Sequence, residues 1–349
     1  MKINLKTNRI LSILIVLLFT GCGSSTPYSP DFDLGVIQTT GSRNKSIIDF
    51  YRDDYTKVGS MTLPFGSMDY HGFIEPIIRE DHLFVIPQGL YDKKDLGIVL
   101  DIDLTDGTNK QIKFDRTNIT SAVVTDDYVY ATSNLNQMVY LDRYDRKTQK
   151  IDTVTLAGWM LHNVEAHNGK LVGAGLDMSD VTTPKVSMFE FDFAAGSYKE
   201  LADLTPYAFD SEPPIHIRSQ GSKIYMTSND QLLVYDDLSK TIQAEILPDG
   251  MARQMLIEGD EMFILHADIV GGSRESSLTI MNLSDQTLKN YPLGETIWQL
   301  VKAGDTIFGL DLTDKAIHRY ELNDKGITKI SSHMLIGEPA LNFSGIFLK

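Results

Sequence analysis

Short apolar segments separated by tight polar turns recur along most of the chain. The pattern is clearest over residues 251–293, where an apolar segment ends at the turn Gly259-Asp260 and three further apolar segments follow. The segments are rich in Val, Ile, Tyr and Phe and are bounded by Gly, Asp, Asn or Ser, which predicts β-strands. No helical period appears after residue 22. The repeat therefore predicts a unit of four antiparallel strands.

Six copies of this unit follow one another along the chain. Their first turns lie near Asp81, Asp127, Gly169, Gly221, Gly259 and Gly304. The spacing averages about 45 residues, which is typical of the blades of a β-propeller. A four-stranded unit cannot bury both of its faces alone, whereas radial stacking of the units hides both. The sequence therefore predicts an all-β propeller.

The two ends of the chain complete the ring in this interpretation. Residues 35–63 supply three strands before the first full copy, and residues 340–349 supply one unpaired strand after the last. Joined together they form a seventh, composite blade, and the pairing removes the last free sheet edge. We expect seven four-stranded antiparallel blades, with six or eight as the alternatives.

The third strand of several copies and the turn after it carry a shared theme. An apolar strand, an acidic residue, a Thr/Ser/Lys turn and a second apolar strand occur at 99–112, 139–151 and 233–246. This theme resembles the PQQ-like and YVTN-type β-propeller superfamily. The resemblance implies architecture only, because such folds carry enzymes, assembly scaffolds and binding modules. With Trp159 and Trp298 as the only tryptophans, the docking repeat of quinoprotein dehydrogenases is missing, and we expect no cofactor.

The N-terminus has the pattern of an export signal. Lys2, Lys6 and Arg9 precede an apolar run over 10–19, and small residues then lead to Cys22, the only cysteine. The run is too short for a membrane span, which needs about 20 residues. The approach to Cys22 resembles the bacterial lipobox, which implies cleavage before this cysteine and its acylation. An ordinary signal peptide with an incidental cysteine is the alternative.

These features divide the chain into three parts. We expect a lipoprotein signal peptide over 1–21, a flexible tether over 22–33 and the propeller over 34–349. The expected location is extracytoplasmic, with Cys22 lipid-anchored to a bacterial membrane. The net charge of −15 argues against nucleic acid as a partner. Since the chain has one cysteine, no intramolecular disulfide can stabilise the fold.

Candidate chemistry lies on the first strand of each blade, which lines the central channel of a propeller. Alignment of the copies on their first turns places one polar residue at a similar level in each blade. These residues are Glu75, Ser121, His162, His216, Gln254, Gln299 and Asn342, with Arg218 and Arg253 adjacent. Two histidines and a carboxylate at one level suit ligand binding or acid–base chemistry. A polar lining of a solvent-filled channel is the alternative interpretation.

Other candidate sites are weaker. No pair of histidines has zinc-ligand spacing on one element, and the acidic segment 101–107 is better explained as a hairpin turn than as a calcium loop. We therefore expect no metal site. Two long loops, at 176–185 and 266–277, each connect the second and third strands of a blade and offer a binding surface on one face for a protein or small-molecule partner.

Because the sequence has no specific catalytic motif, a non-catalytic function is favoured over an enzymatic one. We expect a membrane-anchored, non-catalytic binding or assembly module of the cell envelope. The alternative is a propeller enzyme, a lyase or hydrolase, that uses His162, His216 and Glu75 in the central channel.

Overall fold

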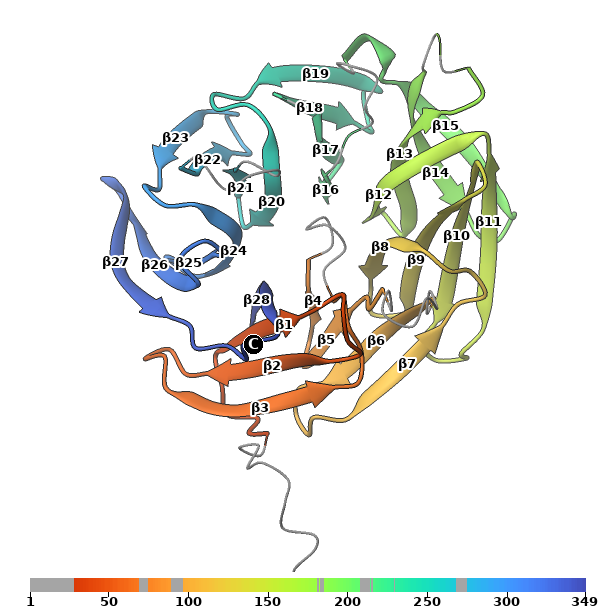
Figure 1. Ribbon diagram of the computed structural model, residues 1–349. Helices are drawn as coiled ribbons and strands as arrows, with labels where there is room; N and C mark the ends of the chain where they lie inside the picture. The colour runs from red at the N-terminus through yellow and green to blue at the C-terminus, as the bar shows by residue number, and fades with distance from the viewer. Residues whose placement is uncertain are drawn as a thin grey trace, which may run out of the picture.

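The computed structural model describes residues 28–68, 75–88, 97–180, 182, 185–207, 214, 216–228, 230–267 and 275–349. Within these residues, seven four-stranded antiparallel sheets are arranged in a ring (Figure 1). The prediction of a seven-bladed all-β propeller is therefore confirmed. The described residues contain one short 3-10 helix, η2 (Thr205–Tyr207), and no helix that could span a membrane. The predicted signal peptide over 1–21 and Cys22 lie outside the described residues.

Each blade is one sheet. In six blades the four strands run outward in chain order, and in the first blade the C-terminal strand takes the innermost place. The first blade contains β28 (Asn342–Leu348), β1 (Leu34–Thr39), β2 (Ser46–Tyr51) and β3 (Lys57–Leu63). The second contains β4 (Ile77–Arg79), β5 (His82–Val85), β6 (Ile98–Asp103) and β7 (Asn109–Lys113). The third contains β8 (Ile119–Val124), β9 (Tyr128–Leu135), β10 (Met138–Asp145) and β11 (Ile151–Ala157).

The remaining four blades have the same organisation. The fourth contains β12 (Trp159–His167), β13 (Lys170–Asp177), β14 (Val186–Asp192) and β15 (Ser197–Asp203). The fifth contains β16 (His216–Gln220), β17 (Lys223–Ser228), β18 (Gln231–Asp236) and β19 (Thr241–Ile246). The sixth contains β20 (Ala252–Glu258), β21 (Glu261–His266), β22 (Ser277–Asn282) and β23 (Leu288–Pro292). The seventh contains β24 (Ile297–Ala303), β25 (Thr306–Asp311), β26 (Ala316–Asn323) and β27 (Gly326–Met334).

The first hairpin turn of each continuous blade lies at the turn residues that the sequence predicts. In the fourth blade, for example, β12 and β13 meet at Asn168-Gly169, and both residues have positive φ angles of 48° and 75°. Such angles suit a two-residue hairpin turn, and Asn and Gly adopt them at little cost. The periodic turn residues therefore set the blade boundaries.

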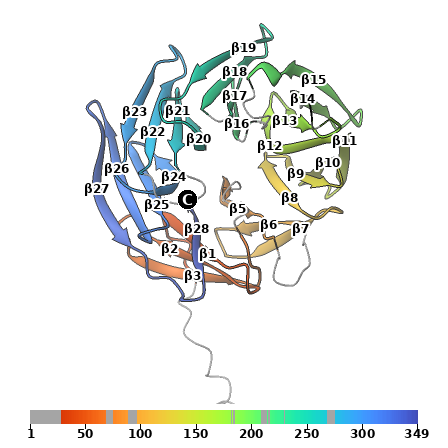
Figure 2. The same cartoon turned by 45° about the horizontal axis from the view of Figure 1, so that its top comes forward.

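Strand β28 closes the ring by pairing with β1 at the inner edge of the first blade (Figure 2). It lies beside the centre of the molecule, where the inner strands of all blades converge. The pairing joins residues about three hundred positions apart in the sequence, such as Gly35 and Phe347. The prediction that the C-terminal strand completes the N-terminal blade is confirmed.

The hydrophobic core is divided among the junctions between blades. Seven clusters of buried side chains occur, and each draws its residues from two adjacent sheets. The cluster between the first and second blades includes Phe50, Leu83 and Phe347, each no more than 1% exposed. Because each blade contributes to two clusters, both of its faces are apolar, as the strand pattern predicts.

One steric contact fixes the closing pair. A Cβ atom added to Gly35 would lie 2.1 Å from Cζ of Phe347, so the aromatic ring occupies the space over this glycine. Gly35 therefore leaves room for the ring that seals the composite blade against the second blade.

We predict that Gly35→Ala destabilises the protein by about 1–3 kcal/mol through overpacking, and that Phe347→Ala costs about 3–5 kcal/mol. The double variant should cost less than the sum, because the smaller residue at 347 gives the new methyl group space. Denaturant unfolding of the four proteins measures this coupling. As a control, Gly35→Ala combined with Phe189→Ala in another junction should be additive, and additivity of the 35/347 pair would contradict the steric account.

Candidate functional site

Two adjoining cavities open at the centre of the propeller. The larger, of about 500 Å³, is lined by residues of the inner strands β4, β8, β12 and β16, and by Glu75 just before β4. The smaller, of about 350 Å³, is lined by residues of β20, β24 and β28 and shares Glu75, Pro76, Ile78 and Ile257 with the first. The inner strands therefore surround one divided channel, which the sequence predicts.

Two carboxylates and one arginine meet in the larger cavity. The Arg218 guanidinium lies 3.3 Å from a carboxylate oxygen of Glu75 and 4.0 Å from one of Glu165. The guanidinium also donates a hydrogen bond to the carbonyl oxygen of Ile217, at 2.9 Å. All three charged side chains are largely but not fully buried, with exposed fractions between 18% and 26%. They can therefore both meet a small ligand and act on it in a partly desolvated environment.

Burial changes the acidity of Glu165. Loss of solvent raises its pKa to about 7, and the charge of Arg218 only partly opposes this shift. A carboxyl group with this pKa exchanges protons near neutral pH, which suits a general acid or base. Glu165 is therefore the residue of the cavity best suited to proton transfer.

His216 contributes a neutral imidazole to the same cavity. Its side chain is 2% exposed, and burial, followed by the charges of Arg218 and Arg253, lowers its pKa to about 3. Its Nε2 atom has no hydrogen-bond partner among the described residues. His216 is therefore uncharged at neutral pH, and its buried ring forms part of the cavity wall.

Arg253 adds a second buried cation close to this group. The Arg253 guanidinium lies over the Trp298 ring, 4.1 Å from its centroid. Burial lowers its pKa to about 10, while Glu75 favours the charged form. At neutral pH Arg253 therefore stays protonated and gives this side of the channel positive potential.

The polar residues predicted for the channel divide into different roles. Glu75, Ser121 and His216 line the larger cavity, and Gln254 and Gln299 line the smaller. The Ser121 hydroxyl donates to Oδ1 of Asn163 at 2.9 Å, which links β8 to β12.

The two glutamines act as clamps between blades. Gln254 accepts from the backbone N–H of Leu300 at 2.6 Å and donates to its carbonyl oxygen at 2.9 Å. Gln299 makes the same two bonds to Ile346, at 2.9 and 3.1 Å. Since their polar atoms satisfy the backbone of the next inner strand, these side chains serve the fold.

His162 and Asn342 do not join this group. Both are exposed, and neither lines either cavity. The register of β12 shifts between Leu161 and Val164, and that of β28 against β1 shifts between Ile37 and Gln38. The same bulge occurs in β8, β20 and β24, so it does not displace the channel residue. In those blades the channel residue lies five positions before the first residue of the hairpin turn, and the same count in β12 gives Asn163, one residue after His162. Convergence of His162, His216 and Glu75 on one point is therefore not observed.

The sequence analysis missed Glu165, although the strand register shows a signal for it. Each continuous blade has one inner-strand residue paired with the third residue of its second strand. These inner residues are Ile77, Val123, Glu165, Arg218, Leu256 and Val301. Two neighbouring blades thus carry opposite charges where the other four carry apolar side chains. A charged pair at an apolar level could have identified the site before the structure did.

The structure describes the two long loops only in part. The loops 176–185 and 266–277 connect the second and third strands of their blades, as predicted, but residues 181, 183, 184 and 268–274 lie outside the described residues. Their expected role in partner binding stays a prediction. The one group of three described side chains that could share a metal ion lies away from both cavities, in the seventh blade.

Comparisons with known proteins identify similar solved structures. No protein-family model matches the chain, and no curated protein does either. The periplasmic gluconolactonase PpgL of Pseudomonas aeruginosa is 14% identical, with a TM-score of 0.62 over 90% of this chain and 99% of that one. A putative 6-phosphogluconolactonase of Bacteroides uniformis is 11% identical, with a TM-score of 0.61 over 91% and 99%. One from Bacteroides fragilis is 13% identical, with a TM-score of 0.58 over 93% and 99%.

These comparisons correct the expected function. Identities of 11–14% establish a shared fold alone. Nevertheless, whole-chain neighbours described as lactonases favour the enzyme alternative over the non-catalytic module that the sequence suggested. The expectation failed because it rested on the lack of a linear catalytic motif, whereas Glu75, Glu165 and Arg218 come together only in the ring.

We predict that His216 makes the protein less stable in acid. Its pKa is about 3 in the folded protein and near 6.5 when unfolded, so the unfolded chain binds the extra proton between these values. The stabilisation is complete above pH 6.5 and declines as pH falls toward 3. The Tm difference between wild type and His216→Gln should therefore shrink between pH 7 and 4.

The exposed Lys147, in the turn between β10 and β11, provides the control, because lysine does not titrate between pH 4 and 7 and Lys147→Gln should shift Tm little and equally at each pH. Glu165 has the opposite dependence, since its raised pKa reduces stability as pH rises from about 4.5 to 7. A constant difference between wild type and His216→Gln across this range would show that His216 is not held neutral.

Proposed function

We propose that the protein is a hydrolase that opens a lactone, a cyclic ester of a sugar acid, in the larger channel cavity. The observation that carries this proposal is Glu165, whose pKa is raised to about 7 beside Arg218. The whole-chain likeness to structures described as gluconolactonase and 6-phosphogluconolactonase supports this substrate class.

The chemistry needs a base and a cation, and the cavity supplies both. Glu165 in its carboxylate form takes a proton from water as the water oxygen bonds to the lactone carbonyl carbon. The carbonyl oxygen gains negative charge, which the Arg218 guanidinium stabilises. The ring C–O bond then breaks, and protonated Glu165 returns the proton to the departing oxygen. The product is the open hydroxy acid, so one water is consumed and no cofactor is required.

The surrounding residues position this pair. Glu75 lies 3.3 Å from Nη2 of Arg218, whereas Glu165 lies nearest Nη1, so Glu75 holds a different nitrogen of the guanidinium and compensates part of its charge. The neutral ring of His216 forms part of the cavity wall beside Arg218. Arg253 contributes positive potential that favours the anionic product-like state.

The cellular setting is part of the proposal. The basic, apolar and small-residue order before Cys22 supports export and acylation, which would place the propeller outside the cytoplasm. A tether over 22–33 would be shorter than expected, because Tyr28 and Phe32 already pack against the core of the first blade. The third-strand theme supports descent from PQQ-like or YVTN-type propellers. The substrate would then be an extracytoplasmic small molecule.

We predict that Glu165→Gln lowers kcat/KM for D-glucono-1,5-lactone by at least about 100-fold, because general acid–base groups contribute about 10²–10⁴. Acid release above the spontaneous rate measures the activity. In wild type, kcat/KM should rise with pH to a plateau with a midpoint near 7, since the base form of Glu165 is the active one. Glu190→Gln is the control, because Glu190 pairs with Lys170 outside both cavities. Equal activity of Glu165→Gln and wild type would exclude Glu165 as the base.

We predict that Cys22→Ser moves the protein from the membrane fraction to the soluble exported fraction or leaves the precursor uncut, because the acylated sulfur is lost. Fractionation and mass spectrometry of the N-terminus measure the outcome. Ser24→Ala, two residues away, should leave anchoring unchanged. A Cys22→Ser protein that is processed and membrane-bound like wild type would refute lipid anchoring.

A further inference from the structure

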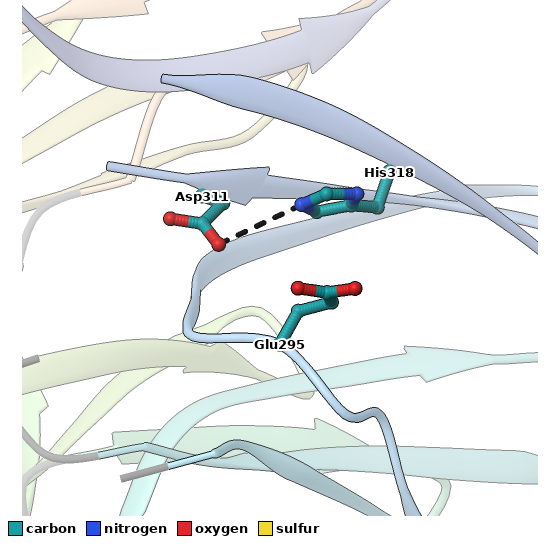
Figure 3. A group of neighbouring side chains, drawn as sticks. All are labelled: Glu295, Asp311 and His318. Carbon is teal, nitrogen blue, oxygen red and sulfur yellow. Dashed lines mark ion pairs between the residues drawn. The ribbon is translucent and has the colours of Figure 1, made fainter. Parts of the chain in front are cut away.

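A second cluster of chemically reactive side chains lies at the junction of the sixth and seventh blades. Glu295 lies in the connection between β23 and β24, Asp311 ends β25, and His318 lies on β26 (Figure 3). One ligand atom of each lies within 4.8 Å of those of the other two. The three residues are brought together by the fold from a 24-residue stretch that has no metal-binding motif.

The strand register explains this convergence. Asp311 pairs with Ala316, and His318 pairs with Gly309, so both side chains project from the same face of the β25–β26 hairpin. Gly309 has no side chain beside the imidazole, and the space over it is bounded by Ile297. The connection between β23 and β24 is held beside this face by a hydrogen bond. The backbone N–H of Ser276, in the sixth blade, donates it to the carbonyl oxygen of Glu295.

The imidazole is buried, and one of its nitrogens lacks a partner. His318 is 3% exposed, and its Nε2 has no hydrogen-bond partner among the described residues. Nε2 points toward Oδ2 of Asp311 at 3.6 Å, which is too long for a hydrogen bond (Figure 3). A buried nitrogen without a partner is costly unless something else occupies the site.

The His318–Asp311 pair differs from the His–Asp pair of the second blade. In the second blade, Nδ1 of His82 and Oδ1 of Asp101 lie 2.6 Å apart and form a direct hydrogen bond. The His318–Asp311 separation of 3.6 Å is instead close to the distance between two ligands of one tetrahedral ion. With metal–ligand bonds of about 2.0–2.2 Å, that distance is about 3.3–3.6 Å.

The remaining atoms of the three residues are already held in place. His318 Nδ1 lies 2.8 Å from the Ser332 hydroxyl, which orients the ring and directs Nε2 inward. Oδ1 of Asp311 accepts from the backbone N–H groups of Thr313 and Asp314, at 2.7 and 2.9 Å. Oε1 of Glu295 pairs with Lys329. One nitrogen and one oxygen of each carboxylate thus lie within 4.8 Å of one another.

We propose that Glu295, Asp311 and His318 bind a divalent transition-metal ion of the zinc class at the junction of the sixth and seventh blades. Imidazole with carboxylates suits zinc better than calcium, which takes six to eight oxygen ligands. Glu295 is 24% exposed, which gives the ion an entry path and leaves a position for water. The ion ties the connection between the blades to the β25–β26 hairpin. This inference is independent of the proposed lactone hydrolysis and replaces the sequence-based expectation of no metal.

The test uses the chain freed of metal with EDTA and then titrated with Zn²⁺ alone, with Ca²⁺ in a parallel titration. We expect one zinc per chain by calorimetry and elemental analysis, an increase in Tm on binding, and no comparable effect of calcium. Substitution with Co²⁺ should give visible absorption bands of a nitrogen- and oxygen-ligated ion. Absence of zinc binding, or equal effects of calcium, would overturn the proposal.

Matched variants separate this site from adventitious binding. His318→Gln should abolish the bound zinc, and Ser332→Ala should weaken binding by about tenfold, because it removes only the orienting partner. His82→Gln removes the His–Asp pair of the second blade and should bind zinc like wild type. Should His318→Gln fail to fold, Glu295→Gln, located in a connection at the surface, tests the same site. Equal zinc binding by Glu295→Gln and wild type, or equal losses in His82→Gln and His318→Gln, would refute the assignment.

Discussion

The structure depends on the antiparallel pairing of β28 with β1. Every blade has apolar side chains on both faces, so no blade can be stable without a neighbour on each side. The pairing of the chain ends provides the first blade with its inner strand and leaves no blade at an open end. The seven junction clusters form because the ring is complete. The contact between Gly35 and Phe347 belongs to this closure and reaches the core beside it.

The inner strands converge around the channel, and their backbone groups need hydrogen-bond partners there. Inner strands of different blades do not pair as ladders, so their backbone groups need other partners. Gln254 and Gln299 provide these partners on one side, where the neighbouring channel residues Leu256 and Val301 are apolar. On the other side Asn134 clamps the backbone of Leu161 in the same way, and Glu75, Glu165 and Arg218 add a group of charges. Hydrogen bonds between blades thus occur on both sides of the channel, whereas the close group of two carboxylates and one guanidinium lies on one side only.

Much of the fold could be predicted because the same pattern of strands and turns recurs in every blade. Turn residues such as Asn168-Gly169 and strands with two apolar faces occur once per blade, and the same level of the inner strand was correctly identified for Ser121, His216, Gln254 and Gln299. His162 was wrong by one residue in the alignment on the turn, since Asn163 lies at the level of Ser121 and Gln254. Asn342 lies on a strand that pairs with β1 from the other end of the chain and has no hairpin turn on which to align it. Glu295, Asp311 and His318 gather through strand register and a connection, so their sequence spacing carries no recognisable motif.

The group of charges on one side of the channel is difficult to explain as a structural device. At the level of Glu165 and Arg218 four other blades carry aliphatic side chains, which shows that the fold accepts an apolar residue there. Replacing a buried ion pair with apolar residues is often neutral or stabilising. Burial raises the pKa of Glu165 to about 7, so its charged form destabilises the folded state above neutral pH. A carboxyl group retained at such a cost, in a cavity and beside a cation, is better explained by proton transfer than by stability.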